Sequence, residues 1–139
     1  MHWIVAGLIA GVGAFFADYV MWGKVFTGPA MEAFGTFPPS PEEGKKMMAA
    51  NLPKAAVVTL AFGVLMAWFY ARLKGGLWVA GGPLGGMEFA TILWLPTTGI
   101  GLINGGIWFD KVRRLYKATF WASLVQINVA GLLVGALIK

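Results

Sequence analysis

The residue in this sequence best placed to do chemistry is Asp18, a carboxylate inside an apolar stretch. By helical rise it lies about 6 Å inside that stretch. A charge at the bilayer centre costs about 2.5–3.5 kcal/mol on insertion scales, and intramembrane carboxylates often carry protons or cations. Two hypotheses follow. Asp18 pairs with Lys54, which begins the next apolar stretch at the same level, or it takes part in transport.

Other polar side chains inside apolar stretches are candidates to join Asp18. Asn104, Ser123 and Thr119 are predicted near its depth, where they would complete a hydrogen-bonded cluster or a small polar cavity. The polar residues predicted within the membrane are Asp18, Asn104, Ser123, Gln126 and Asn128.

The sequence contains no recognisable catalytic constellation. Cysteine is absent, and His2 is the only histidine, so neither thiol chemistry nor a histidine-rich metal site can be built. The glycine-rich segment 75–86 lacks the Lys-Ser/Thr ending of a phosphate loop. We therefore expect no enzyme activity, no metal site and no cofactor held by this chain alone, although a bound lipid or pigment stays open.

These residues must be positioned by membrane-spanning helices. The chain has 139 residues, is 58% hydrophobic and is only 12% charged, about half the charged fraction of a soluble domain. Four apolar stretches, at about 3–22, 52–71, 88–109 and 118–138, approach the roughly 20 residues that span a bilayer. The composition predicts one all-α membrane domain over 1–139, a four-transmembrane-helix bundle. The first stretch is expected to be retained rather than cleaved as a secretory signal.

The connections between the stretches also carry local signals. Ser40, Pro41 and Glu43 form a capping box, which predicts a short surface helix over about 41–50 in the first loop. The segment from Lys74 to Gly86 is too glycine-rich for a predicted helix. Glu88 is expected to open the third span, where the helix dipole favours a carboxylate.

Small residues predict where the helices meet, because they let backbones approach closely in lipid. Asp18 falls on the same face as Gly7, Gly11 and Ala14, within about 60°. In the second stretch an unbroken ridge of small residues runs from Ala55 to Ala71 in steps of four. The residues expected to make packing contacts are Gly7, Gly11, Ala14, Thr59, Gly63, Ala67, Gly101, Gly105, Gly131 and Gly135.

The last stretch has two opposed faces of polar or small residues. Thr119, Ser123 and Gln126 line one face, and Asn128, Gly131 and Gly135 line the other. Two such faces exceed what a minimal four-helix bundle requires, which favours contact with another protein.

Basic residues predict the orientation in the membrane. Eight of the eleven Lys and Arg residues lie in or beside the first and third loops, which places those loops in the cytoplasm and both termini outside. We read the net charge of +5 as membrane topology rather than nucleic-acid binding. The compact basic turn of Lys111, Arg113, Arg114 and Lys117 is suited to anionic lipid headgroups.

The order of short motifs resembles that of a known family. Tyr-Val-Met-Trp-Gly-Lys, residues 19–24, closes the first stretch, and Lys-Lys-Met, residues 45–47, precedes the second. Asn104 and Phe-Asp-Lys, residues 109–111, end the third, and Asn128 and Gly131 mark the fourth. Over the whole chain this resembles a family of small bacterial four-span integral membrane proteins of unknown function. The resemblance implies the four-span fold and a bacterial inner membrane, and it implies no site residues.

Two functions remain as expectations. The first is a non-enzymatic accessory or structural subunit that packs against other integral membrane proteins in a larger complex, such as a bioenergetic one. The alternative is an oligomeric transporter or channel for a small solute or ion that uses Asp18. The partners expected are membrane lipids and other membrane proteins or further copies of the chain.

Overall fold

The computed structural model describes residues 1–34, 40–79 and 81–138, and this described part is almost entirely helical. The helices are α1 (Trp3–Val20), α2 (Thr27–Phe34), α3 (Pro41–Leu73), α4 (Gly82–Trp94), α5 (Ile100–Trp108) and α6 (Arg113–Leu137). A π-helical turn, Met21–Val25, extends α1, and a second, Leu95–Gly99, joins α4 to α5. Short 3-10 turns, Lys74–Gly76 and Asp110–Val112, follow α3 and precede α6.

Four helical segments are long and apolar enough to cross a membrane, as predicted. They are Trp3–Val25, Pro41–Gly76, Gly82–Trp108 and Arg113–Leu137. The all-α, four-span architecture is therefore confirmed, and the chain is a multi-pass membrane protein by the length and composition of its helices.

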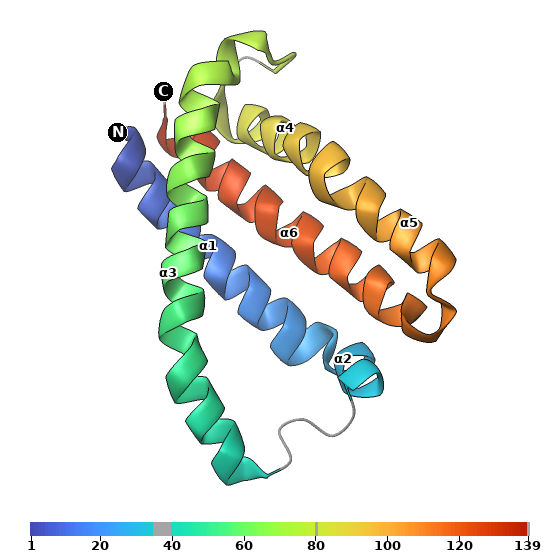
Figure 1. Ribbon diagram of the computed structural model, residues 1–139. Coiled ribbons are helices and arrows are strands. Elements are labelled where there is room, and N and C mark those ends of the chain that lie inside the picture. Colours follow the sequence, from blue (N-terminus) through green and yellow to red (C-terminus); the bar gives the residue numbers. More distant parts are fainter. Residues whose placement is uncertain (35–39, 80, 139) are drawn as a thin grey trace.

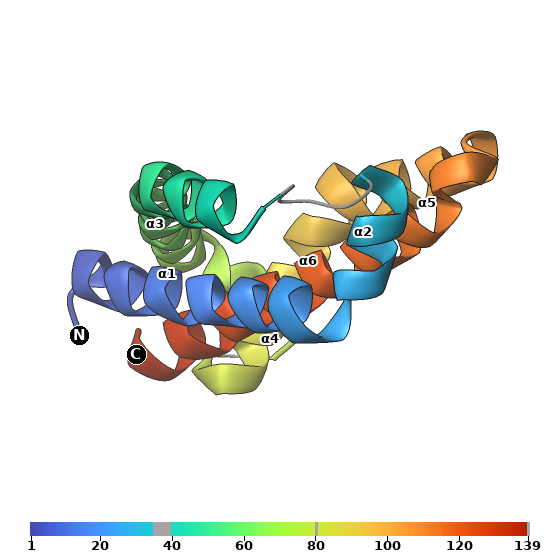
Figure 2. The ribbon, with the colours of Figure 1, turned by 90° about the horizontal axis from the view of Figure 1, so that it is seen from below.

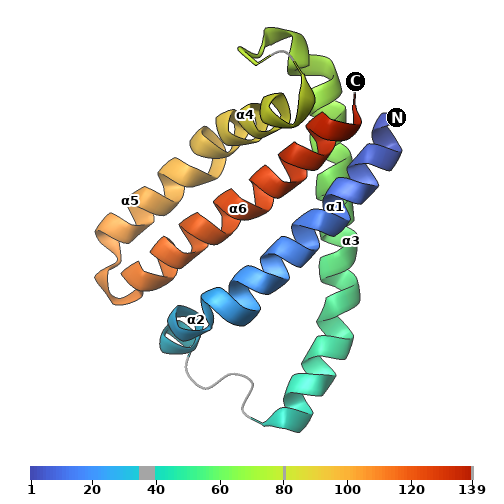
Figure 3. The same cartoon turned by 180° about the vertical axis from the view of Figure 1, so that it is seen from behind.

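The helices form an open row rather than a closed ring. α6 packs against α4 and α5 on one side and against α1 on the other, while α3 packs mainly against α1 (Figures 1 and 3). Figure 2 shows α3 lying across one side of α1. The two chain termini lie at the same end of the molecule (Figure 1). We call this the terminal end, and the opposite end, with α2 and the α5–α6 turn, the basic end.

The crossing of α1 and α3 depends on glycine. A Cβ atom on Gly63 would overlap the carbonyl oxygen of Gly7 and the backbone of Gly11. Conversely, a Cβ on Gly7 would lie 2.6 Å from the Cα of Val64. The two backbones are thus in direct contact, as small-residue helix interfaces in membranes allow.

A second glycine crossing joins α4 to α6. A Cβ on Gly86 would overlap the carbonyl oxygen of Gly131, and a Cβ on Gly135 would overlap that of Gly82. Gly131 also faces Ala90, and a Cβ atom added to Gly131 would lie 2.6 Å from the Cβ of Ala90.

The buried core lies around and between these crossings. Tyr70 of α3 packs edge-to-face on Phe89 of α4, with ring centroids 5.6 Å apart. Alanine residues of α1 and α6 fill the space between the larger side chains. The buried residues of this core are Ala6, Ala10, Ala14, Met66, Ala67, Tyr70, Phe89, Ala90, Trp94, Ile127, Ala130, Val134 and Ile138.

The first loop differs from the prediction in one respect. Ser40 caps a helix as expected, since its hydroxyl accepts from the backbone N–H of Glu43 at 3.2 Å. That helix does not end near residue 50, however. It continues through Pro53 as α3, and the short helix of the loop is α2 instead. Pro53 lies in an exposed part of α3 and donates no N–H to the preceding turn of that helix.

The third span also begins earlier than predicted, at Gly82 rather than at Glu88. Gly81 and Gly82 have φ angles of +78° and +70°, which glycine adopts readily. Further along, the π-helical turn accommodates Pro96, and the Thr97 hydroxyl donates to the carbonyl of Leu93 at 2.7 Å.

We predict that Gly63→Ala destabilises the protein by about 1–3 kcal/mol, because the added methyl must push two backbones apart. Gly101→Ala is the matched control, since no atom lies within 4 Å of a Cβ at that helical position. The measurement is unfolding of both variants in detergent micelles, followed by helical circular dichroism. Equal stability of the two variants would contradict the backbone contact between α1 and α3.

Candidate functional site at the basic end

Asp18 lies in the last turn of α1, and its side chain is partly exposed. The side chain of Trp22, four residues on, lies near its carboxylate. Among the described residues no cation forms an ion pair with Asp18; the salt bridge described there joins Arg114 to Glu32.

The predicted ion pair between Asp18 and Lys54 is therefore not formed. The antiparallel register explains why. Gly7 faces Gly63 and Gly11 faces Leu60, so continuing the register places Asp18 near the level of Lys54. The axes of α1 and α3, however, diverge toward the basic end (Figures 1 and 3). Lys54 is exposed as a result.

The burial of the small-residue ridge of α3 decreases along the helix in agreement with this divergence. Gly63 and Ala67 are buried against the bundle, Thr59 is half-buried, and Ala55 is exposed. Hence the face of α3 that meets α1 at the crossing continues beyond it uncovered, opposite the face of α1 that carries Asp18. We call this region the α1–α3 opening.

The other predicted intramembrane polar residues do not gather around Asp18. Asn104 of α5 is exposed and accepts from the indole N–H of Trp108 at 3.2 Å. Ser123 of α6 accepts from the indole N–H of Trp94 at 3.0 Å. Gln126 is half-buried on α6. The expected cluster around Asp18, with its polar cavity, is thus absent from the part of the chain that the structure describes.

Two of these polar groups join α4 to α6. Besides the Trp94–Ser123 bond, the Thr91 hydroxyl donates to the side-chain oxygen of Asn128 at 3.1 Å. Asn128 in turn donates to the carbonyl of Leu124 at 2.9 Å. Thr119 also satisfies its own helix, by donating to the carbonyl of Leu115 at 2.8 Å. The Trp94–Ser123 and Thr91–Asn128 bonds thus link two helices, as polar side chains often do in lipid.

Most predicted packing residues lie at helix contacts. Gly7, Gly11 and Gly63 form the first crossing, and Gly131 and Gly135 take part in the second. Ala14 and Ala67 are fully buried. A Cβ on Gly105 would lie 2.5 Å from the ring of Tyr116, which packs directly against this glycine. Gly101 is exposed, with open space beside it.

Sequence reasoning missed the α4 side of the second crossing. Gly82 and Gly86 were expected in a loop, yet they begin α4 and lie against α6. Their spacing of four, continued by Ala90, was the available signal. The high glycine content concealed it, because glycine lowers intrinsic helix propensity.

Glu88 organises the loop between α3 and α4. Its two carboxylate oxygens accept from the backbone N–H groups of Trp78 and Val79, at 2.9 and 2.7 Å. Glu88 was expected to interact with the helix dipole. Instead, it fixes the preceding loop through charge-assisted hydrogen bonds.

The four cations of the basic turn have different surroundings. Arg114 forms an ion pair with Glu32 of α2 at 2.9 Å. The Nε of Arg113 donates to the carbonyl of Gly106 on α5 at 2.9 Å. Lys111 is exposed in the turn before α6. Lys117, one helical turn after Arg113, is exposed and makes no ion pair among the described residues.

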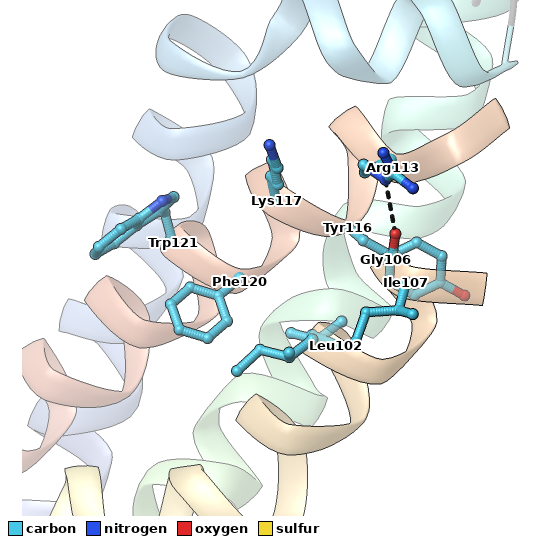
Figure 4. A pocket seen from close by; sticks show the side chains of 9 residues that line it. Leu102, Gly106, Ile107, Arg113, Tyr116, Lys117, Phe120 and Trp121 are labelled. Atoms are coloured by element: carbon cyan, nitrogen blue, oxygen red, sulfur yellow. Dashed lines mark hydrogen bonds between the residues drawn. The ribbon is translucent and has the colours of Figure 1, made fainter. Parts of the chain in front are cut away.

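Arg113 and Lys117 border an apolar groove between α5 and α6 (Figure 4). Its cavity volume is about 420 Å³. We call it the α5–α6 groove, and its lining residues are Leu102, Ile103, Gly106, Ile107, Arg113, Tyr116, Lys117, Phe120 and Trp121.

No family model matches the chain, and neither a curated protein nor a solved structure matches it. What the chain shares with the four-span family that its motifs resemble is therefore architectural, namely four long apolar helices.

We predict an energetic coupling of about 0.6 kcal/mol between Thr91 and Asn128, the average measured by double-mutant cycles for hydrogen bonds between membrane helices, with about 1.7 kcal/mol as the upper limit. The test is a double-mutant cycle of Thr91→Ala and Asn128→Ala, with unfolding measured in micelles. Thr98→Ala replaces Thr91→Ala in a control cycle, because no hydrogen bond joins Thr98 to Asn128 in the structure. Additive effects in the first cycle would contradict the α4–α6 hydrogen bond.

Proposed function

We propose that this protein is a non-enzymatic membrane subunit whose α1–α3 opening receives a helix of another integral membrane protein. The observation that carries the proposal is the exposure of side chains where α1 and α3 part: Ala55 is exposed, and Thr59 and Asp18 are half-buried. In this proposal the basic end faces the cytoplasm and both termini lie outside, since eight of the eleven Lys and Arg residues are near the basic end.

The uncovered part of the α3 ridge is suited to a helix. Ala55 continues the series that includes Gly63 and Ala67, both buried where α1 is close. In lipid there is little hydrophobic drive between helices, so small residues favour association by allowing close van der Waals contact. A partner helix at Ala55 would extend the kind of contact that α1 makes further along.

Asp18 supplies the specificity of the proposed contact. Its carboxylate lies on the same face of α1 as Gly7 and Gly11, and it forms no ion pair with a cation of the described residues. A carboxylate at membrane depth is stabilised by an opposite charge, which here would be a Lys or Arg of the partner helix. The same charge would disfavour helices that lack a cation there, which is how charged groups select partners.

The transport alternative has weaker support. It calls for polar groups near Asp18, yet Asn104 and Ser123 accept hydrogen bonds from tryptophans on α5 and α4. Transport by Asp18 would predict proton-coupled flux in liposomes that Asp18→Asn abolishes while assembly persists.

The first test places a photo-crosslinking amino acid at Ala55, in the opening. The control places it at Val57, which is 67% exposed but lies off the ridge. After irradiation of intact membranes, position 55 should give one crosslinked product with a different protein, and position 57 should give none of that product. Native mass measurement of the mildly extracted complex should show the same partner. A chain that runs alone, or only with copies of itself, would overturn the proposal.

The second test reverses the charge at the opening. We expect Asp18→Lys to abolish the crosslink at position 55, and Asp18→Asn to reduce it, because the partner's cation would be repelled or left unpaired. Glu42→Lys is the control, since Glu42 is exposed in the first turn of α3, away from the opening. If Asp18→Lys leaves the crosslink intact, Asp18 does not select the partner.

A further inference from the structure

We propose that the α5–α6 groove binds one acyl chain of an anionic phospholipid, whose phosphate is held by Lys117 and Arg113. The groove volume of about 420 Å³ lies within the ~300–1,000 Å³ typical of small-molecule sites. The inference is independent of the proposed subunit role, because the groove and the α1–α3 opening lie on different helices.

The groove is amphipathic along its length. Arg113 and Lys117 lie on one side of it, and Phe120 and Leu102 lie on the opposite side (Figure 4). Arg113 and Phe120 are seven residues apart on α6, a rise of about 10 Å. A phospholipid has the same polarity, with a charged phosphate at one end and hydrocarbon below it.

Arg113 and Lys117, the two cations that line the groove, differ from Arg114 in their interactions. Arg113 is fixed by its bond to the Gly106 carbonyl, so its charge is held beside the groove. Lys117 has no carboxylate partner among the described residues, whereas Arg114 is paired with Glu32. Two of the four cations of the basic turn, Arg113 and Lys117, thus line the groove.

The lining favours a lipid over a soluble anion. Inorganic phosphate would contact the two cations but would leave the apolar surfaces of Leu102, Ile107 and Phe120 uncovered. Near a membrane surface each Lys or Arg contributes about 1 kcal/mol to the binding of anionic lipid. A zwitterionic lipid offers no net charge to the same pair, so the groove should select by headgroup charge.

Gly106 allows the apolar part of the groove to be blocked. A Cβ there would lie 3.6 Å from the Cβ of Tyr116, which is ordinary contact. A leucine at this position should therefore project into the groove without displacing backbone. Gly101→Leu is its control, because Gly101 is also on α5 but does not line the groove.

The experiment is native mass spectrometry of the full chain in detergent with equal concentrations of phosphatidylglycerol and phosphatidylcholine. Wild type should retain one phosphatidylglycerol in preference to phosphatidylcholine. Lys117→Gln should weaken that retention about fivefold, and Lys111→Gln should leave it unchanged, since Lys111 does not line the groove. Gly106→Leu should remove the adduct, Gly101→Leu should preserve it, and added inorganic phosphate should not displace it.

Three outcomes would overturn the inference. They are equal retention of the two lipids by wild type, equal effects of Lys117→Gln and Lys111→Gln, and displacement of the adduct by inorganic phosphate. Because Lys117 is exposed, its substitution tests the site even if Gly106→Leu fails to fold.

Discussion

The structure depends on direct backbone contact at two glycine crossings. Lipid tails are as apolar as the side chains of a membrane helix, so there is little hydrophobic drive for two helices to associate. Their association therefore depends on close packing and hydrogen bonds. Gly63 against Gly7 and Gly11, and Gly86 against Gly131 and Gly135, supply that packing. Every span takes part in one of the two crossings, and contact between α1 and α6 joins the two pairs.

The crossings also explain why the two ends of the molecule differ. The core residues, among them Ala10, Tyr70 and Val134, lie around the crossings. At the terminal end, Glu88 also fixes the connecting loop. Toward the basic end α3 leaves α1, and its residues before Ala56 are exposed, apart from half-buried Gly44 and Met47. Helices that touch at one point and cross at an angle must separate away from it, so the opening follows from the geometry of the crossing.

Much of this architecture could be predicted from the sequence, because it depends on local signals. Span length follows from runs of apolar residues, and the Ser40 cap follows from a four-residue pattern. The ridge through Gly63 follows from helical periodicity. The separation of Asp18 from Lys54 could not be predicted, because it depends on the crossing angle of two helices, which no local pattern encodes. The α5–α6 groove likewise exists only once Tyr116 is seated on Gly105 and α5 lies beside α6.

The distribution of polar groups then has a consistent physical meaning. Ser123 and Asn128 make hydrogen bonds with α4, which leaves little unsatisfied polarity between α4 and α6. Asp18 and Lys117, by contrast, carry full charges near the basic end and form no ion pair among the described residues. A charge at or near the membrane boundary is stabilised by an opposite charge more than by hydrocarbon. Since the described part of the chain supplies none to either residue, the two proposals above place a cation of a partner helix at Asp18 and a lipid phosphate at Lys117.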